Sequence, residues 1–270
     1  MSTFEMQKQI GLDKFRQNLW MHQAAQEIEE NYGDKIEAVG KTITKFGENE
    51  LVGTSEATIM SLPSAVLSET HVATNLITQV SSSSASPKIL LVTGSVADGV
   101  FTYVSQEITL TGQTAAPLTT ALARVQRVYN SGSAVLVGNV YVSQTDTLTA
   151  GVPDTSAKIH AIAPLAENQT LKAASTTANG EYMLISKIYA SINDKTLAAA
   201  VVRLSIRNAG GVFRTQTKRA INSQGPSLEF ACEPFLIVPP NSDIKMSAEA
   251  DGASTPVSTG YAGILVNAYA

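Results

Sequence analysis

Apolar and polar residues alternate over much of the chain, and the clearest such run covers residues 88–113. It predicts two β-strands joined by a turn, because β-branched and aromatic residues lie on both sides of an Ala-Asp-Gly turn signal. The alternation changes phase within the second strand, since Phe101 and Tyr103 belong to one phase and Ile108 and Leu110 to the other. A change of phase inside a strand predicts a bulge, here between Tyr103 and Ile108.

Similar short apolar runs continue from Ala57 onward, separated by turn residues such as Asn179-Gly180, a pair typical of two-residue β-hairpins. Strands are predicted at residues 57–61, 72–80, 88–94, 101–110, 122–129, 134–143, 157–163, 169–176, 181–192, 197–207, 212–221, 227–232, 243–250 and 260–268. Many strands at short intervals without an intervening helix are typical of a sandwich, jelly roll or barrel. The predicted fold class is therefore mainly β, with a jelly-roll or β-sandwich body.

The first part of the chain has helical periodicity instead. Residues 4–32 predict an amphipathic helix, with Leu12, Phe15 and Leu19 at positions i, i+3 and i+7 and Trp20 beside them. Because such a helix cannot bury its apolar face alone, it must pack on its own β-body, on another copy of the chain or on a partner. All four residues are candidates for a protein interface.

A second, shorter helix is predicted at residues 34–47, where Asp34 and Glu37 form a pair that is similar to a capping box. Its apolar positions follow one face at i, i+3, i+7 and i+10, and Gly47 is a natural helix stop. These positions, also candidates for a protein interface, are Ile36, Val39, Ile43 and Phe46. The two helices together predict a helical N-terminal arm over residues 1–56.

A short internal sequence repeat bears on how the β-body is divided into domains. Gly99-Val100-Phe101 recurs as Gly211-Val212-Phe213, and each copy opens a polar strand rich in Thr and Gln. Two arrangements are compatible with this repeat: one continuous body over residues 57–270, or two related halves at 57–150 and 151–270. We favour the continuous body, since the matching residues are few.

Composition excludes several classes of protein. At 16% charged and 44% hydrophobic residues, the 270-residue chain is typical of a globular protein. Its net charge of −4 argues against general nucleic-acid binding, which needs a basic surface. No run approaches the about 18 apolar residues of a membrane span, and the N-terminus lacks the apolar core of a signal peptide. The single cysteine, Cys232, excludes an internal disulfide framework. We expect neither a nucleic-acid nor a membrane partner.

Residues that carry chemistry form no recognisable site. His22, His71 and His160 are not at metal-ligand spacing, and the serine run at 81–84 is not a nucleophile elbow. Carboxylates are sparse in the β region and occur mainly at turns. We therefore predict no catalytic, cofactor-binding or metal-binding residue, no cofactor and a non-enzymatic function.

A basic cluster lies in the last third of the chain. Arg203 and Arg207 share one strand face, and Arg214, Lys218 and Arg219 follow after a turn. The cluster is either a solvated sheet face or a contact surface for an acidic partner, such as the acidic arm of a neighbouring subunit. Arg203 and Arg207 are accordingly the last two candidate interface residues.

Several short segments follow one another in a characteristic order along the chain. The run KFGENELVGTSEATI at residues 45–59 joins a Phe-Gly pair to the first predicted strand. Further segments lie at residues 81–85, 107–114, 124–129, 137–140, 169–171 and 211–214. This ordered set resembles segments of virion structural proteins from tailed bacteriophages, marine phages especially. The chain departs from that pattern at residues 59–62, where the family has a tryptophan.

The resemblance implies a non-enzymatic virion protein, located in the virion after assembly in the host cytoplasm. Its expected role is capsid decoration: a cement protein that stabilises the shell through contacts with the major capsid protein or other virion proteins. A homo-oligomer is expected, with a trimer as the specific guess. A head–tail connector or a tail-fibre attachment protein is the alternative within the same class.

A glycan-binding, receptor-binding β-sandwich is a different alternative. It would need exposed aromatic rings on one sheet face to stack on sugars. The candidates for such stacking are Tyr103, Tyr129, Tyr141, Tyr182 and Tyr189. A glycan-cleaving enzyme is a third alternative, which rests only on unpaired carboxylates.

Overall fold

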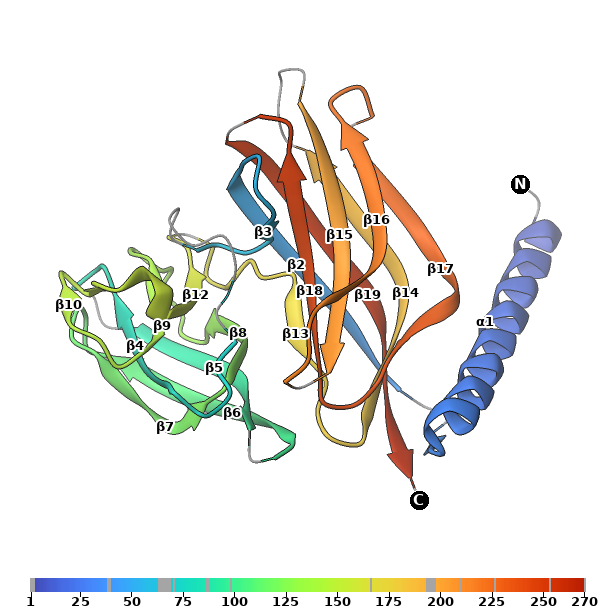
Figure 1. Ribbon diagram of the computed structural model, residues 1–270, viewed down its shortest axis with the longest axis horizontal. Helices are drawn as coiled ribbons and strands as arrows, with labels where there is room; N and C mark the ends of the chain where they lie inside the picture. Colours follow the sequence, from blue (N-terminus) through green and yellow to red (C-terminus); the bar gives the residue numbers. More distant parts are fainter. Residues whose placement is uncertain are drawn as a thin grey trace.

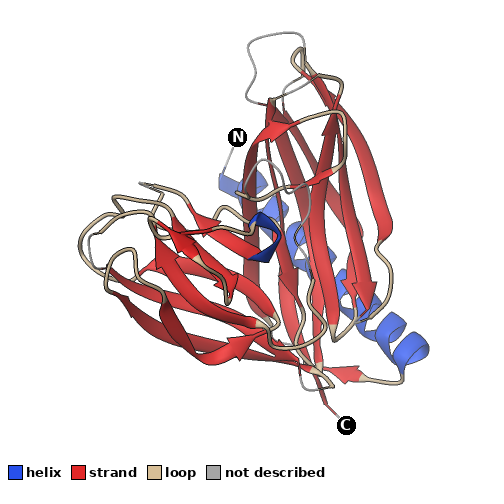
Figure 2. Cartoon of the chain, turned by 60° about the vertical axis from the view of Figure 1, so that its left-hand side comes forward, coloured by secondary structure: helices blue, strands red, loops and turns tan. Residues whose placement is uncertain are grey.

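The computed structural model shows two β-sandwiches and one long N-terminal helix (Figures 1 and 2). It describes residues 3–37, 40–62, 69, 71–85, 88–97, 99–165, 167–192, 198–208, 210–225, 227–252 and 254–269, without the side chains of residues 3–17, 88 and 89. The helix is α1 (Thr3–Tyr32), and all paired strands are antiparallel. The mainly β fold class with a helical N-terminal arm is confirmed.

The larger sandwich is a jelly roll. One sheet has the strand order β2-β19-β14-β17 and the other has the order β13-β18-β15-β16. The bounds are β2 (Lys41–Val52), β13 (Ala174–Thr176), β14 (Glu181–Ile192), β15 (Ala199–Asn208), β16 (Arg214–Asn222), β17 (Ser227–Val238), β18 (Ser242–Ala250) and β19 (Thr255–Tyr269). If these eight strands are numbered 1 to 8 along the chain, the first sheet has the order 1-8-3-6 and the second sheet has the order 2-7-4-5. This order is that of an eight-stranded jelly roll.

The jelly-roll core lies between these two sheets. Met183 and Ile185 of β14 face Leu204 of β15 and Met246 of β18 across it, and all four side chains are fully buried. The alternate β14 residues are also buried, under α1, so this strand is apolar on both faces. Burial on both faces explains its continuous apolar run from Tyr182 to Ile185.

The smaller sandwich is inserted into one edge strand of the jelly roll. Both β3 (Ala57–Thr58) and β13 pair with β18 in consecutive registers. Between them, the Ile59 amide donates to the Met246 carbonyl, and the Met246 amide donates to the Ala173 carbonyl, both at 2.9 Å. The chain therefore leaves this strand at Ile59 and returns to it at Ala173.

The inserted sandwich has the sheets β12-β9-β4-β7 and β6-β5-β8. The bounds are β4 (Ile77–Ser82), β5 (Lys88–Ala97), β6 (Phe101–Leu110), β7 (Ala116–Leu122), β8 (Arg124–Asn130), β9 (Val140–Gln144) and β12 (Ile159–Ala163), with a short hairpin of β10 (Leu148–Thr149) and β11 (Val152–Pro153) and a 3₁₀ turn at Ser156–Lys158. Its own core includes Leu90, Leu110 and Leu122. Residues 57–270, for which one continuous body was favoured, thus form two sandwiches, and the jelly roll uses chain from both sides of the insertion. The alternative boundary between residues 150 and 151 falls inside the β10–β11 hairpin.

The predicted hairpin of β5 and β6 is present, but the predicted bulge in β6 is wrong. Its pairing with β5 is regular from Phe101 to Leu110. The change of phase has another cause: the Phe101 amide donates to the Asn241 side chain, and the Tyr103 hydroxyl donates to the Thr176 carbonyl. The start of β6 therefore packs outward on the jelly roll, whereas Ile108 and Leu110 pack inward.

The predicted second helix at residues 34–47 is also wrong. The short strand β1 (Lys35–Ile36) and β2 both pair with β19, so this segment belongs to the jelly roll and not to a helical arm. Ile43 and Phe46, spaced by three residues, lie on opposite faces of β2, where Ile43 is half-buried and Phe46 exposed. Two β-branched residues flanking Ile43 favour a strand there.

Helix α1 covers the outer face of the β2-β19-β14-β17 sheet, on the side away from the inserted sandwich (Figure 1). Ala24 and Ile28 are fully buried against this sheet. The Trp20 ring meets the Phe235 ring of β17 edge-on, with 6.2 Å between centroids. The described part of the helix thus packs on its own chain.

Candidate functional site

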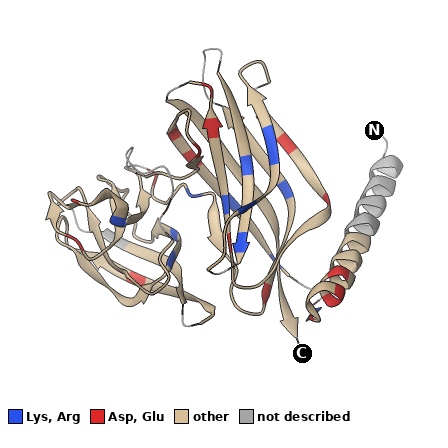
Figure 3. Ribbon diagram, in the orientation of Figure 1, with Lys and Arg blue, Asp and Glu red and all other residues tan. Residues whose placement is uncertain are grey.

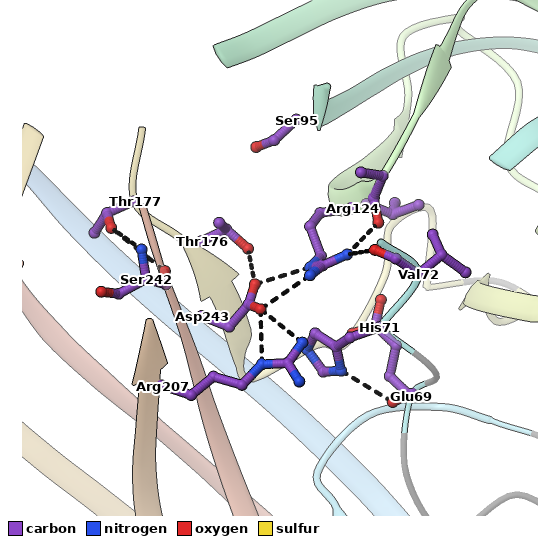
Figure 4. A network of polar contacts seen from close by, with 12 residues as sticks. Glu69, His71, Val72, Ser95, Arg124, Thr176, Thr177, Arg207, Ser242 and Asp243 are labelled. Carbon is purple, nitrogen blue, oxygen red and sulfur yellow. Dashed lines mark hydrogen bonds and ion pairs between the residues drawn. The ribbon is translucent and has the colours of Figure 1, made fainter. Parts of the chain in front are cut away.

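The two sandwiches are joined by a buried carboxylate, Asp243 of β18 (Figure 4). Arg124 of the inserted sandwich donates from Nε and Nη2 to its two oxygens, at 2.8 and 3.0 Å. Arg207 of β15 donates to Oδ2 at 2.8 and 2.9 Å, and the Thr176 hydroxyl donates to Oδ1 at 2.7 Å. With two guanidinium groups on one carboxylate, the cluster ties the inserted sandwich to the jelly roll.

The arginines of this cluster also explain the repeated Gly-Val-Phe segments. The Arg124 guanidinium lies 5.1 Å from the Phe101 ring centroid, and that of Arg207 lies 4.6 Å from the Phe213 ring centroid. Each copy therefore supplies an aromatic ring beside one of the two arginines that bind Asp243. The repeat therefore corresponds to two equivalent ring–guanidinium contacts at the junction between the sandwiches.

The carboxyl of Asp243 is kept ionised by its partners. Burial alone would raise its pKa, but the hydrogen bonds and charge of Arg124, with smaller contributions from His71 and Thr176, lower the pKa from 3.8 to about 2. Because this pKa is lower in the folded state than in the unfolded chain, the group stabilises the fold above about pH 4 and loses that effect as pH falls through 2.

We predict that acid removes about 2 kcal/mol of the free energy of unfolding through this group. Urea unfolding of the native chain and of Asp243→Asn at pH 7, 4 and 2 measures it. The stability difference between the two proteins should shrink toward pH 2, because the carboxyl is then neutral in both states. A difference that stays constant from pH 7 to pH 2 would contradict this assignment.

A second buried ion pair lies nearby. The Lys172 ammonium is 2.7 Å from Glu69 Oε2 and also donates to the Val125 carbonyl of β8 at 2.8 Å. Both side chains are almost fully buried. Lys172 precedes β13, so this pair also fastens the inserted sandwich at the point where the chain returns to the jelly roll.

Beside this pair, a cavity of about 400 Å³ separates β2 from β8. Lys45 of β2 reaches across and donates to the Gln126 carbonyl at 3.0 Å. Burial, and then the charges of Lys172 and Arg127, lower the pKa of Lys45 from 10.5 to about 7. Three basic residues, Lys45, Arg127 and Lys172, line this cavity, and sequence patterns gave no sign of it.

Among the candidate interface residues, Trp20 and Ile36 are buried or half-buried against their own chain. Leu19 and Phe46 are 43% and 44% exposed, and Ile43 is half-buried beside the jelly-roll core. The side chains of Leu12 and Phe15, and all of Val39, lie outside the described residues. Leu19 and Phe46 therefore remain accessible to a partner.

The basic cluster lies on β15 and β16 (Figure 3). Arg203 pairs with Glu249 at 2.6 Å, and Arg207 binds Asp243, so both arginines are neutralised within the chain. The exposed members of the cluster are Arg214, Lys218 and Arg219. A surface for an acidic partner would depend on these three residues of the edge strand β16.

The five tyrosines considered for sugar stacking have different environments. Tyr141 and Tyr182 are buried. Tyr129 and Tyr189 are half-buried, and the Tyr189 hydroxyl donates to the Lys45 carbonyl at 2.8 Å. Tyr103 is 41% exposed. Core packing accounts for Tyr141 and Tyr182, which leaves Tyr103 as the most accessible ring.

The three histidines have different environments. His22 is exposed on α1, His71 meets the Phe213 ring at 5.2 Å, and buried His160 contacts Gln144 at 3.1 Å. Within the described residues, no group of three or more His, Cys, Asp or Glu side chains could hold a metal ion. No helix in the described part of the chain is both long and apolar enough to cross a membrane.

Of the junction residues, Arg207 was singled out from the sequence, but Arg124 and Asp243 were missed. Arg124 lies between Ala123 and Val125, and Asp243 precedes Ile244, so each charge stands within a buried strand. A charge at a buried strand position signals an internal partner. That signal could have identified both residues but could not have paired them.

Comparisons with known proteins find no matching family model and no matching curated protein. Solved structures that match include the Gt strain of infectious bursal disease virus, at 11% identity over 87% of this chain and 74% of that chain, with a TM-score of 0.21. The Gx strain gives 8% identity over 86% and 73%, with a TM-score of 0.24. The virus's VP2 subviral particle gives 10% identity over 84% and 71%, with a TM-score of 0.18. Similarity at this level carries no argument about fold or function.

Proposed function

We propose that this protein is a structural component of a tailed-bacteriophage virion, and specifically a capsid decoration protein. The observation that carries the proposal is the strand order of the larger sandwich, because jelly rolls are a recurrent architecture of viral capsid proteins. The ordered segments that resemble tailed-phage structural proteins support the same class. A head–tail connector or a tail-fibre attachment protein is the alternative position.

The proposed mechanism is the burial of surface between subunits. Contacts of about 1,600 Å² repeated over many copies would reinforce a shell without any catalytic group. Arg203, Arg207 and Asp243 hold the chain's own sheets, so partner contacts would use accessible residues such as Phe46 and Lys218. The proposed partners are the major capsid protein, other virion proteins and further copies of this chain, with a trimer as the specific assembly.

Electron microscopy of particles assembled with and without this protein tests the proposal. Density for the jelly roll on the outer capsid surface is the expected result, and light scattering of the free protein should give the mass of three chains. Density at the neck or tail would replace decoration with the alternative position. Particles that never incorporate the protein would overturn the virion role.

We predict that removing residues 1–33 makes the protein self-associate. The deletion uncovers Tyr182, Phe235 and Val266, which are buried beneath α1, and exposed apolar patches promote association. Light scattering across a concentration series should show a mass that rises with concentration. The full-length chain is the control, and a truncated protein of constant mass would show that α1 is not needed as a cover. Deletion through residue 47 is unsuitable, because it also removes most of β2.

A further inference from the structure

The cavity between the two sandwiches lies where two sheets end. Among the described strands β2 pairs with β19 alone, and β8 ends its three-stranded sheet, with residues 168–170 bonded along the second half of its outer edge. The lining residues are Thr42, Ile43, Thr44, Lys45, Phe46, Thr93, Gln126, Arg127, Gln169, Thr170, Leu171 and Lys172. A volume of about 400 Å³ is within the usual range of small-ligand sites.

The described residues that line the cavity include three cations and no carboxylate. Lys172 is neutralised by Glu69, which leaves Lys45 and Arg127 as uncompensated cations. The Arg127 guanidinium lies over the Tyr129 ring and donates to the Gln169 side chain, so it is held in place without a counter-ion. Two fixed cations in one hollow favour an anionic ligand.

Lys45 is the strongest reason to expect such a ligand. Its ammonium has three donors, and in the described chain one acceptor, the Gln126 carbonyl, is within hydrogen-bond distance. The charged groups that face it are Lys172 and Arg127, both positive, and they add to the effect of burial in lowering its pKa. An anion that accepts the remaining donors would relieve both the repulsion and the missing hydrogen bonds.

Other lining residues fit a sugar. The hydroxyls of Thr42 and Thr44 lie on β2 at the exposed side of the cavity, and the Phe46 ring is accessible beside them. An adjoining hollow of about 350 Å³ shares Lys45 and is lined by the accessible ring of Tyr103. Lys45 lines both hollows, and one accessible ring lines each of them, a combination that matches the apolar faces and the charge of a short acidic glycan.

We propose that this cavity binds an acidic saccharide, with its carboxylate on Lys45 and Arg127 and its sugar face against Phe46. The inference goes beyond the virion role proposed above and does not rest on it. A soluble uronic acid, glucuronate, is a suitable probe, and glucose is the matched neutral sugar.

Ligand-observed NMR with the full-length chain at pH 6 tests the proposal. Glucuronate should bind, and glucose and acetate should bind at least about tenfold more weakly, because each lacks one half of the recognised group. Lys45→Met should weaken glucuronate binding by about tenfold or more. Lys41→Met is the matched control, since Lys41 is an exposed residue on the same face of the same strand, and it should leave binding unchanged.

Raising the pH from 6 to 8.5 should weaken glucuronate binding, because Lys45 loses its proton as pH rises through its lowered pKa. If Lys45→Met fails to fold by circular dichroism, the exposed Arg127→Gln provides the same test. Equal binding of glucose or acetate, unchanged binding in the folded variant, or binding only of an acidic peptide would overturn the proposal.

Discussion

Replacing Asp243 with alanine is expected to lower the free energy of unfolding by about 3–5 kcal/mol. The substitution leaves Arg124 and Arg207 buried without their shared carboxylate, and their side chains are only 6% and 16% exposed. It also removes the acceptor of the Thr176 hydroxyl. Removing one partner of a buried charge cluster costs more than the cluster contributes, because desolvated charges remain. Urea unfolding at pH 7 measures the loss.

A surface ion pair of the same length is the control for this prediction. Lys187 and Glu229 are 2.8 Å apart, as are Arg207 and Asp243, but their side chains are 45% and 64% exposed. Glu229→Ala should therefore change the free energy of unfolding by at most about 1 kcal/mol. Equal losses from the two alanine substitutions would show that burial does not set the strength of the Asp243 cluster.

Much of the β architecture could be predicted from local patterns. The β5–β6 hairpin at residues 88–113 has both the alternation and the turn residue that such a hairpin needs, since Gly99 has a positive φ of 76°. A jelly-roll body was expected from the density of strands and is present. The prediction failed in β6, where Phe101 and Tyr103 face a second sandwich. Alternation reports which residues are buried, and not against which layer.

The helix expected at residues 34–47 failed for a related reason. Apolar spacings of three and four residues place Ile36, Ile43 and Phe46 on one face of a helix, but Ile36 lies in β1, and Ile43 and Phe46 lie on opposite faces of β2. β2 pairs with β19 on one edge, and Ile43 packs toward the jelly-roll core. Long-range pairing of this kind overrides a local helical period.

The junction site could not be predicted from spacing along the chain. Arg124 and Asp243 are 119 residues apart, and Lys45 and Gln126 are 81 apart. These pairs meet because 113 residues, from 60 to 172, are inserted between Ile59 and Ala173. Both of these residues hydrogen-bond to the backbone of Met246 on β18. Such an insertion leaves strand patterns intact on both sides, so no linker signal marks its ends.

A close backbone contact where the insertion meets β2 gives the second large prediction: Gly47→Ala should lower the free energy of unfolding by about 3 kcal/mol. A Cβ on Gly47 would lie 2.3 Å from the Ala173 amide nitrogen and 2.5 Å from the Ile59 carbonyl oxygen. Those two atoms form the 3.0 Å hydrogen bond that closes the insertion where it leaves and rejoins the strand. Both are backbone atoms held by β18, so they cannot move aside without breaking the edge of the jelly roll.

Gly53→Ala is the matched control, because a Cβ at Gly53, just past the end of β2, meets nothing within 4 Å. This substitution should be neutral or slightly stabilising, since it restricts the unfolded chain. Thermal and urea unfolding of both variants compare the two positions directly. A Gly47→Ala protein as stable as the Gly53→Ala protein would mean that β2 can move away from the Ile59–Ala173 closure, and that the insertion is not locked against the jelly roll at this point.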